Sequence, residues 1–457
     1  MMIQRPRGTR DFLPEDTWQR GRVKRTMEGR LLSWGYQEVA TPTFEHLELF
    51  TIKSGDAIIE EIYSFKDKGG RDLALRPELT APVMRMYVNE LQGAPKPLRL
   101  YYFGSCFRYE RPQHGRFREF WQLGCELIGG RSPDAEAETI ALAHDLLRSV
   151  NISGEVHLGH LGAVRRVLKR IPKAVRPVIT GLIDKKERDH LKEYLEEIGA
   201  DHLGLIDLIS LKGKGAVEEA RDLLEEIEEI PEYVEEEGES TSSGKDLSYR
   251  REDLPGGRAA RRERVQSQDM VEGELDKFAE LIDLLEYYGV SAKVDFEIVR
   301  GLDYYTGCVF EIYGEGLGAQ NQICGGGAYR LAGLLGGKEI ESTGFALGFD
   351  RIMEIANVAE LRRAPVVLAF TPQAKGEAIR AAGILRRKIP IVIDVMSRGL
   401  AAQLKYANIA GARHVVIIGE KEAVAGKLML KDMEKGEQEC LTLDEMVVRL
   451  DEMYPEQ

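Results

Sequence analysis

The sequence contains no long apolar stretch and few cysteines. No uninterrupted apolar run could cross a bilayer, and the first residues, MMIQRPRGTRDFLPED, lack the apolar core of a secretion signal. We therefore expect a cytoplasmic protein without a membrane segment. The five cysteines are scattered and form no C-x-x-C pair, so the sequence favours neither a disulfide framework nor a zinc knuckle.

Clustered metal ligands and an excess of positive charge are missing too. His157 and His160 lie in EVHLGH, a predicted strand, where residues three apart point to opposite faces, and no third ligand follows at a useful spacing. We predict no protein metal site. The net charge of −13 argues against a protein that coats nucleic acid without specificity, so any RNA contact should be regional.

The sequence does have the size of a large globular chain, and it contains a hairpin of unusual composition. The 457 residues, 43% hydrophobic, should form two or three domains. Segment 98–129 is typical of two strands joined by a basic loop. Because side chains alternate along a strand, one polar face should collect Arg108, Glu110, Gln122 and Glu126. Such a face suits a ligand with phosphate and ammonium groups; the alternative is an ordinary solvent-facing hairpin.

Three further segments should present polar side chains at the ends of strands. In DLALRPELTAPVMRMYV a strand breaks at Pro77, which leaves Glu78 and Thr80 near a helix start, although Thr80 could simply cap that helix. In VDFEIVRGLDYYTGCVFEIYG two strands flank a turn that carries Arg300, Tyr304 and Tyr305; paired tyrosines are otherwise core filler. In STGFALGFDRIMEIANVAEL a strand enters a helix whose first turn, favourable to anions, holds Arg351, which could also be a surface arginine.

The rest of the chain divides by composition. Residues 161–224 are predicted to be helix-rich. From 225 to 268 an acidic run, a polar spacer and a basic run favour a mobile linker. From Ala364 onward, strands alternate with helices, which indicates an α/β unit with a partly parallel sheet. A Rossmann-type cofactor domain is the alternative there, but no G-x-G-x-x-G opens its helices.

Together these motifs resemble the histidyl members of the class II aminoacyl-tRNA synthetases. F-R-x-E, an R-x-R loop and QLGCE resemble motif 2, and G-F-D-R resembles motif 3. L-R-P-E-x-T and R-G-L-D-Y-Y-T-G resemble histidyl signatures, and GLAAQLKYANIAGARHVVIIGEKE resembles the class IIa anticodon-binding domain. The glycine-rich ICGGGAYR departs from the common G-G-R-Y-D-G-L at Ala328 and Arg330. The resemblance covers nearly everything except 225–268.

The resemblance implies a fold. It consists of an α+β catalytic domain, with an antiparallel sheet and flanking helices, a helical insertion and a C-terminal α/β anticodon-binding domain. The expected boundaries are 1–152 and 269–361 for the catalytic segments, 153–268 for the insertion and 364–457 for the anticodon-binding domain. An N-terminal helix, strand and proline resemble motif 1, which implies a homodimer.

The resemblance also implies an activity and its residues. The activity is histidine–tRNA ligation, in which L-histidine reacts with ATP to give histidyl-adenylate and is then transferred to the 3′ end of tRNA(His). Magnesium should accompany ATP without a dedicated protein cage. The implied catalytic residues are Arg108 and Arg300. The implied histidine-binding residues are Glu78, Thr80, Arg108, Gln122, Glu126, Arg300, Tyr304 and Tyr305. The implied ATP-binding residues are Arg108, Glu110, Arg116, Phe117 and Arg351, and the implied tRNA-binding residues are Arg111, Gln113, Lys405 and Tyr406.

Two other functions remain open. One is that of a catalytically silent paralogue, the regulatory subunit of ATP phosphoribosyltransferase, which binds histidine without charging tRNA. That paralogue lacks the anticodon-binding domain and usually has eroded ATP-binding arginines, whereas both are present here. The other is a generic RNA-binding protein with a vestigial site, which the complete set of motifs disfavours.

Overall fold

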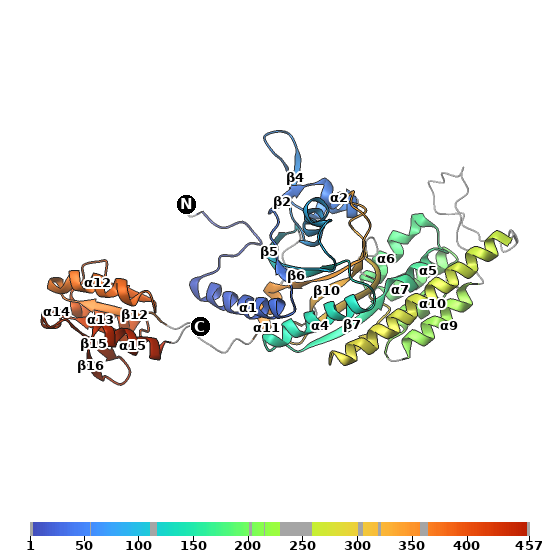
Figure 1. Ribbon diagram of the computed structural model, residues 1–457. Coiled ribbons are helices and arrows are strands. Elements are labelled where there is room, and N and C mark those ends of the chain that lie inside the picture. The colour runs from blue at the N-terminus through green and yellow to red at the C-terminus, as the bar shows by residue number, and fades with distance from the viewer. Residues whose placement is uncertain are drawn as a thin grey trace. The chain divides into compact units, whose positions relative to one another are not determined.

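The computed structural model describes residues 3–54, 56–109, 117–200, 203–213, 215–228, 258–299, 305–318, 321–356 and 364–454. The chain forms two compact units, Met1–Val358 and Ala359–Gln457 (Figure 1). Among the described residues, none of the helices combines the length and apolar character needed to cross a membrane.

An eight-stranded sheet organises the first unit. Its order is β1-β5-β6-β11-β10-β9-β7-β8. The strands are β1 (Gln37–Glu38), β5 (Leu98–Phe107), β6 (Glu119–Ile128), β7 (Gly154–His160), β8 (Ala292–Val294), β9 (Tyr305–Gly314), β10 (Gln322–Tyr329) and β11 (Ser342–Gly348). The interior pairs are antiparallel, as expected, whereas β1 with β5 and β7 with β8 are parallel. The sheet is therefore mixed at its two edges.

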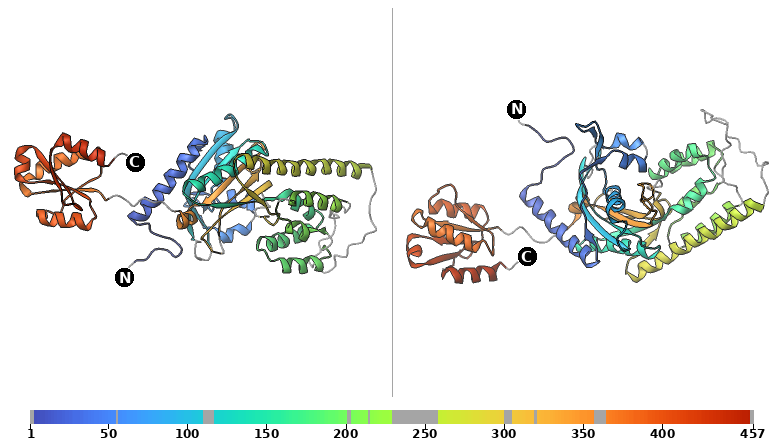
Figure 2. Two further views of the ribbon diagram at one scale, coloured as in Figure 1. Left: turned by 90° about the horizontal axis from the view of Figure 1, so that it is seen from below. Right: turned by 45° about the horizontal axis from the view of Figure 1, so that its top comes forward.

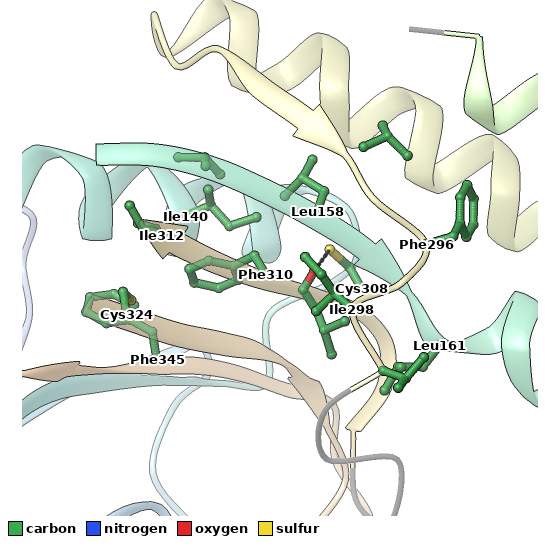
Figure 3. Close-up of a cluster of buried hydrophobic side chains, with 14 of the residues drawn as sticks. Ile140, Leu158, Leu161, Phe296, Ile298, Cys308, Phe310, Ile312, Cys324 and Phe345 are labelled. Atoms are coloured by element: carbon green, nitrogen blue, oxygen red, sulfur yellow. Dashed lines mark hydrogen bonds between the residues drawn. The ribbon is translucent and has the colours of Figure 1, made fainter. Parts of the chain in front are cut away.

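Long helices cover one face of this sheet. They are α1 (Pro14–Ser33), α4 (Asp134–Ser149) and the C-terminal part of α10 (Arg258–Tyr287). Val23, Met27 and Leu31 recur at helical spacing in α1 and are fully buried. Figure 3 shows Ile140 of α4 among Phe310, Ile312 and other buried side chains of the sheet.

The other face of the sheet carries a second, smaller layer. It contains α3 (Thr80–Met86) and a three-stranded sheet of β2 (Phe44–His46), β4 (Asp72–Leu75) and β3 (Ser64–Lys66). Val83 and Met84 of α3 pack with Leu100 and Tyr102 of β5 and with Tyr329 of β10. This layer therefore places the start of α3 over the hairpin.

Residues 161–228 form a set of helices that we call the helical insertion (Figure 2). They are α5 (Leu161–Leu168), α6 (Arg176–Asp184), α7 (Arg188–Glu197), α8 (Leu205–Ser210) and α9 (Ala216–Glu228). The prediction of a mobile linker over 225–268 is wrong at both ends of that range, because α9 continues to Glu228 and α10 already begins at Arg258. RAARRERVQSQ contains strong helix formers and no glycine or proline, which explains the early start. Residues 229–257 lie outside the description.

The second unit is the predicted α/β unit. Its sheet has the order β13-β12-β14-β15-β16, with the first three strands parallel and the last two antiparallel. The strands are β12 (Val366–Phe370), β13 (Ile391–Ile393), β14 (His414–Ile418), β15 (Lys427–Asp432) and β16 (Gln438–Thr442). The helices are α12 (Lys375–Leu385), α13 (Leu400–Ile409), α14 (Glu420–Ala425) and α15 (Leu443–Met453). Strand β16 and helix α14 are not predicted from the sequence pattern.

Candidate active site

A cavity of about 910 Å³ lies in the first unit, against the polar face of the hairpin. Side chains from the hairpin, from the start of α3, from β9 and from the end of β11 meet there. The sequence-predicted residues that line it are Glu78, Thr80, Arg108, Phe117, Gln122, Glu126, Tyr305 and Arg351. Segments far apart in the chain thus converge on one space.

The register of the hairpin explains why its polar residues share a face. Leu100 of β5 lies opposite Glu126 of β6, and Gly104 lies opposite Gln122. Side chains at even positions therefore point to the same side on both strands. This confirms the predicted common face for Gln122 and Glu126, both of which reach the cavity together with Arg108.

Glu126 is a buried carboxyl held by two tyrosines. Tyr329 donates its hydroxyl to Oε2 at 2.5 Å, and Tyr102 donates to Oε1 at 3.2 Å. Burial raises the pKa of Glu126 to about 8, and the hydrogen bonds from Tyr329, Thr80 and Tyr102 oppose that rise. A carboxyl with a pKa near neutrality can hold or release a proton according to the ligand beside it.

The wall behind Glu126 is built from backbone. A Cβ on Gly344 of β11 would lie 1.9 Å from Oε2 of Glu126 and 2.5 Å from the carbonyl oxygen of Cys125. Glycine is therefore the residue that leaves room for the carboxylate to fold back against β11.

Glu78 combines a capping role with a position at the cavity. Its Oε2 accepts from the Thr80 amide at 2.6 Å, and its Oε1 accepts from the Ala81 amide at 3.1 Å. The sequence offered Thr80 as a possible cap of this helix. In the structure the side chain of Glu78, not that of Thr80, accepts from the first amides of α3. Both side chains still line the cavity, and Thr80 helps to lower the pKa of Glu126.

Cationic and aromatic groups also line the cavity. Arg108 donates from Nε to the carbonyl of Pro77 at 3.1 Å, and its guanidinium lies 5.2 Å from the Phe120 ring centroid. Arg351 stands in the first turn of α11 (Phe349–Ile355), as predicted, and donates to the carbonyl of Gln322. Two guanidiniums therefore border one space, as a polyanionic ligand requires.

The N-terminal segment packs against Phe117 and Asp350 of the cavity wall. The guanidinium of Arg10 lies 3.4 Å from the ring centroid of Phe117. Asp350 accepts from Arg20 Nη1 at 2.7 Å and from the Trp121 amide at 2.8 Å, and it forms an ion pair with Arg10, whose Nη2 lies 2.7 Å from Oδ1. Asp350 is buried, so one carboxylate ties the N-terminal segment, the hairpin and α11 together.

Sequence reasoning missed three buried groups at the cavity or beneath it. Tyr102 and Tyr329 hold Glu126, and Glu311 of β9 accepts from Tyr313 and from Gln322, the latter at 2.8 Å. Strand alternation could have identified Tyr102, because it shares the face of Arg108. Tyr329 follows three glycines and an alanine in ICGGGAYR, a pattern that indicates close approach of backbone and gives no sign of a role for the tyrosine hydroxyl.

The remaining predicted residues are outside the cavity or outside the description. The predicted residues Glu110, Arg111, Gln113, Arg116, Arg300 and Tyr304 lie outside the described residues. Lys405 and Tyr406 are exposed on α13 of the second unit, and the Arg398 guanidinium lies 4.6 Å from the Tyr406 ring centroid.

Comparisons with known proteins agree with this architecture. Residues 8–248 and 246–352 match the family model of histidyl-tRNA synthetase, and residues 365–453 match that of an anticodon binding domain. The chain is 48% identical to a histidine–tRNA ligase of Methanosarcina acetivorans, over 98% of this chain and 99% of that protein. It is 44% identical to the Archaeoglobus fulgidus counterpart, with the same coverage. The crystal structure of apo S. aureus histidyl-tRNA synthetase superposes with a TM-score of 0.69 at 26% identity, covering 98% of this chain and 99% of that one.

Proposed function

This chain belongs to the histidyl-tRNA synthetase family and is an ATP-dependent enzyme that joins histidine to tRNA, and we propose that the cavity is where it activates L-histidine. The observation that supports this site best is the convergence of eight predicted side chains on one space. They supply carboxyls for an amino acid and guanidiniums for a phosphate chain. The product would be histidyl-adenylate, which the 3′ end of tRNA(His) then attacks.

The amino-acid half of the site is proposed to lie around Glu126. Glu126 and Tyr305 would each meet one nitrogen of the imidazole, with Tyr329 fixing the carboxylate. An analogue without either nitrogen would leave a buried polar group unpaired, which is a strong basis for selectivity. Glu78, Thr80 and Gln122 would hold the α-ammonium group, and Tyr304 would line the same pocket.

The nucleotide half is proposed to lie around Arg108 and Arg351. The histidine carboxylate would attack the α-phosphorus of ATP in line, with pyrophosphate as the leaving group. The protein's work is then to hold the reactants and to offset the phosphoryl charge. Arg108 and Arg300 would grip the α-phosphate and the carboxylate, and Arg351 with Arg116 the outer phosphates. Phe117, with Arg10 against its ring, would stack on adenine, whose amino group would donate to Glu110.

Magnesium is proposed to arrive with ATP. Carboxylate and amide oxygens are the protein ligands it prefers, usually one or two together with phosphate oxygens and water. The carboxylate of Glu311 and the amide of Gln322 line the cavity and fit that requirement. No group of three or more His, Cys, Asp or Glu ligands occurs in the part of the chain described. When bound, the ion would offset charge on the leaving pyrophosphate.

The assembly and partners follow the same proposal. Arg111 and Gln113 would contact the acceptor end of tRNA, and Lys405 and Tyr406 the anticodon. We also propose a homodimer, a cytoplasmic location, and the division into catalytic segments 1–152 and 269–361, an inserted segment 153–268 that contains the helical insertion, and an anticodon-binding domain 364–457. A light-scattering mass would test the dimer.

Histidine-dependent exchange of pyrophosphate into ATP tests the proposed function. Purified chain with histidine, ATP and magnesium should exchange without tRNA, and Arg108→Ala should lower the rate by about 100-fold or more. Arg330→Ala is the matched control, because Arg330 pairs with Glu341 away from the cavity and should leave the rate unchanged. Absence of exchange by the unmodified chain would point instead to the silent regulatory paralogue.

A further inference from the structure

Two buried carboxylates lie on the segment that follows β8. Asp295 and Glu297 are only 7% and 8% exposed, and both line the cavity. Phe296 and Ile298 alternate with them, and Figure 3 shows both among the buried side chains of the sheet. The segment is therefore anchored in the core on one side and carries charge at the cavity wall on the other.

Two cations that pair with these carboxylates come from the helical insertion. Lys212 places Nζ 3.0 Å from Asp295 Oδ2 and 2.9 Å from Glu297 Oε2. Arg188, the first residue of α7, places Nε 2.7 Å from Glu297 Oε1. A backbone hydrogen bond adds to these ion pairs, because the amide of Gly213 donates to the carbonyl of Val294 at 3.0 Å. The insertion is thus docked on the strand edge through backbone and charge.

The pKa values of Asp295 and Glu297 indicate that both carboxyls are ionised in this network. Burial tends to raise the pKa of both carboxyls, yet His157 and Lys212 beside Asp295, and Arg188 and Lys212 beside Glu297, hold both pKa values below their usual range. Both carboxylates therefore stay ionised at neutral pH. Removal of Lys212 would take one cationic partner from both buried carboxylates at once and leave only His157 beside Asp295 and Arg188 beside Glu297, which favours a shift of the segment.

The helical insertion also contacts the start of β9 through a side chain of α5. Arg165 of α5 donates from Nη2 to the carbonyl of Tyr305, and from Nη1 to the carbonyl of Thr306 at 3.5 Å. Helix α5 packs against β9, the strand that begins at Tyr305. The backbone that presents Tyr305 to the cavity is therefore fixed by an insertion side chain.

We propose that the helical insertion is a positioning element for histidine activation, with Lys212 and Arg188 acting through Asp295 and Glu297, and Arg165 acting through the Tyr305 backbone. The inference rests on the proposed function, since it assigns the insertion a role in placing Tyr305 against the imidazole. The role is exerted on the first half-reaction and needs no tRNA.

The test is the pyrophosphate exchange of full-length Lys212→Met without tRNA. A small displacement of a substrate-reading residue costs about tenfold or more, so the KM for histidine should rise by about tenfold. The KM for ATP should stay within about twofold, because Arg108 and Phe117 are carried by the hairpin. Lys212→Arg keeps the positive charge, so its KM for histidine should lie close to that of the unmodified chain.

Arg221→Met is the matched control. Arg221 of α9 pairs with Asp276 of α10 at 2.8 Å and touches neither carboxylate, so its loss should change stability without changing the histidine KM. Should Lys212→Met fail to fold, Arg188→Gln takes its place. The Arg188 side chain is 42% exposed and forms its ion pair with Glu297, not with Asp295.

A double-mutant cycle with Tyr305→Phe shows whether Lys212 acts through Tyr305. If it does, Lys212→Met should raise the histidine KM much less in the Tyr305→Phe background than in the unmodified chain. A folded Lys212→Met or Arg188→Gln enzyme with an unchanged histidine KM would overturn the inference while leaving the proposed function intact. Lack of exchange by the unmodified chain would instead overturn the proposed function.

Discussion

Tyr329 donates its hydroxyl hydrogen to Oε2 of Glu126 across 2.5 Å, although 203 positions separate the two residues in the chain. The contact joins β10 to β6 across β11, which lies between them in the sheet. It fixes the carboxylate that we propose meets the imidazole.

Tyr329→Phe should weaken histidine binding. The substitution removes one donor from a buried carboxylate, so Glu126 loses orientation and part of its charge stabilisation. We expect the histidine dissociation constant, measured by calorimetry, to rise by about tenfold or more. Tyr36→Phe is the control, because Tyr36 is also buried and donates to Glu138 at 3.1 Å outside the cavity. Equal affinities for the two variants would contradict the role of Tyr329.

Glu126→Gln should change how stability depends on pH. The Glu126 pKa rises on folding from 4.5 to about 8, so in that window the native carboxyl keeps a proton that the unfolded chain has lost. Stability from this residue is thus complete below pH 4.5 and falls, by about 1.4 kcal/mol per pH unit, as pH rises toward 8. Urea unfolding of the ligand-free protein at pH 5 to 8 should show Glu126→Gln gaining stability relative to the unmodified chain. Parallel pH profiles would contradict the raised pKa.

Gly344→Ala should block the histidine site by steric conflict. The new methyl group would lie 1.9 Å from Glu126 Oε2, so the carboxylate must leave its position. We expect calorimetry to show at least about a tenfold loss of histidine affinity. Gly333→Ala is the control, since its nearest neighbour would be Cβ of Glu339 at 3.9 Å. A Gly344→Ala variant that binds histidine normally would mean that the carboxylate can act from elsewhere.

Asp350→Asn should destabilise the first unit. It leaves the guanidiniums of Arg10 and Arg20 without their buried counter-charge, which costs about 3 kcal/mol or more. Asp72→Asn removes an exposed ion pair with Lys66 and should cost about 1 kcal/mol or less. Urea unfolding midpoints compare the two, and similar losses would show that Asp350 does not act as a buried anchor.

The sequence predicted the parts of the site that depend on local pattern. Strand alternation placed Gln122 and Glu126 on one face, and the strand-to-helix change placed Arg351 in a first helical turn. These inferences work because period and turn chemistry are read over a few neighbouring residues.

The rest depends on contacts between distant segments. Nothing in the sequence around Tyr329 says that its hydroxyl reaches Glu126, because that depends on the order of strands in the sheet. Asp350 likewise acquires its partners only when Arg10 and Arg20 pack beside it. The charge of residues 258–268 favoured a linker, whereas the helix propensity of the same residues determined the structure there.

A crystal structure of the chain with L-histidine and a non-hydrolysable ATP analogue tests the central claim most directly. We expect one imidazole nitrogen within hydrogen-bonding distance of Glu126 and the other beside Tyr305, with the guanidinium of Arg108 at the α-phosphate. An imidazole bound away from Glu126, or a phosphate chain beyond the reach of Arg108 and Arg351, would contradict it.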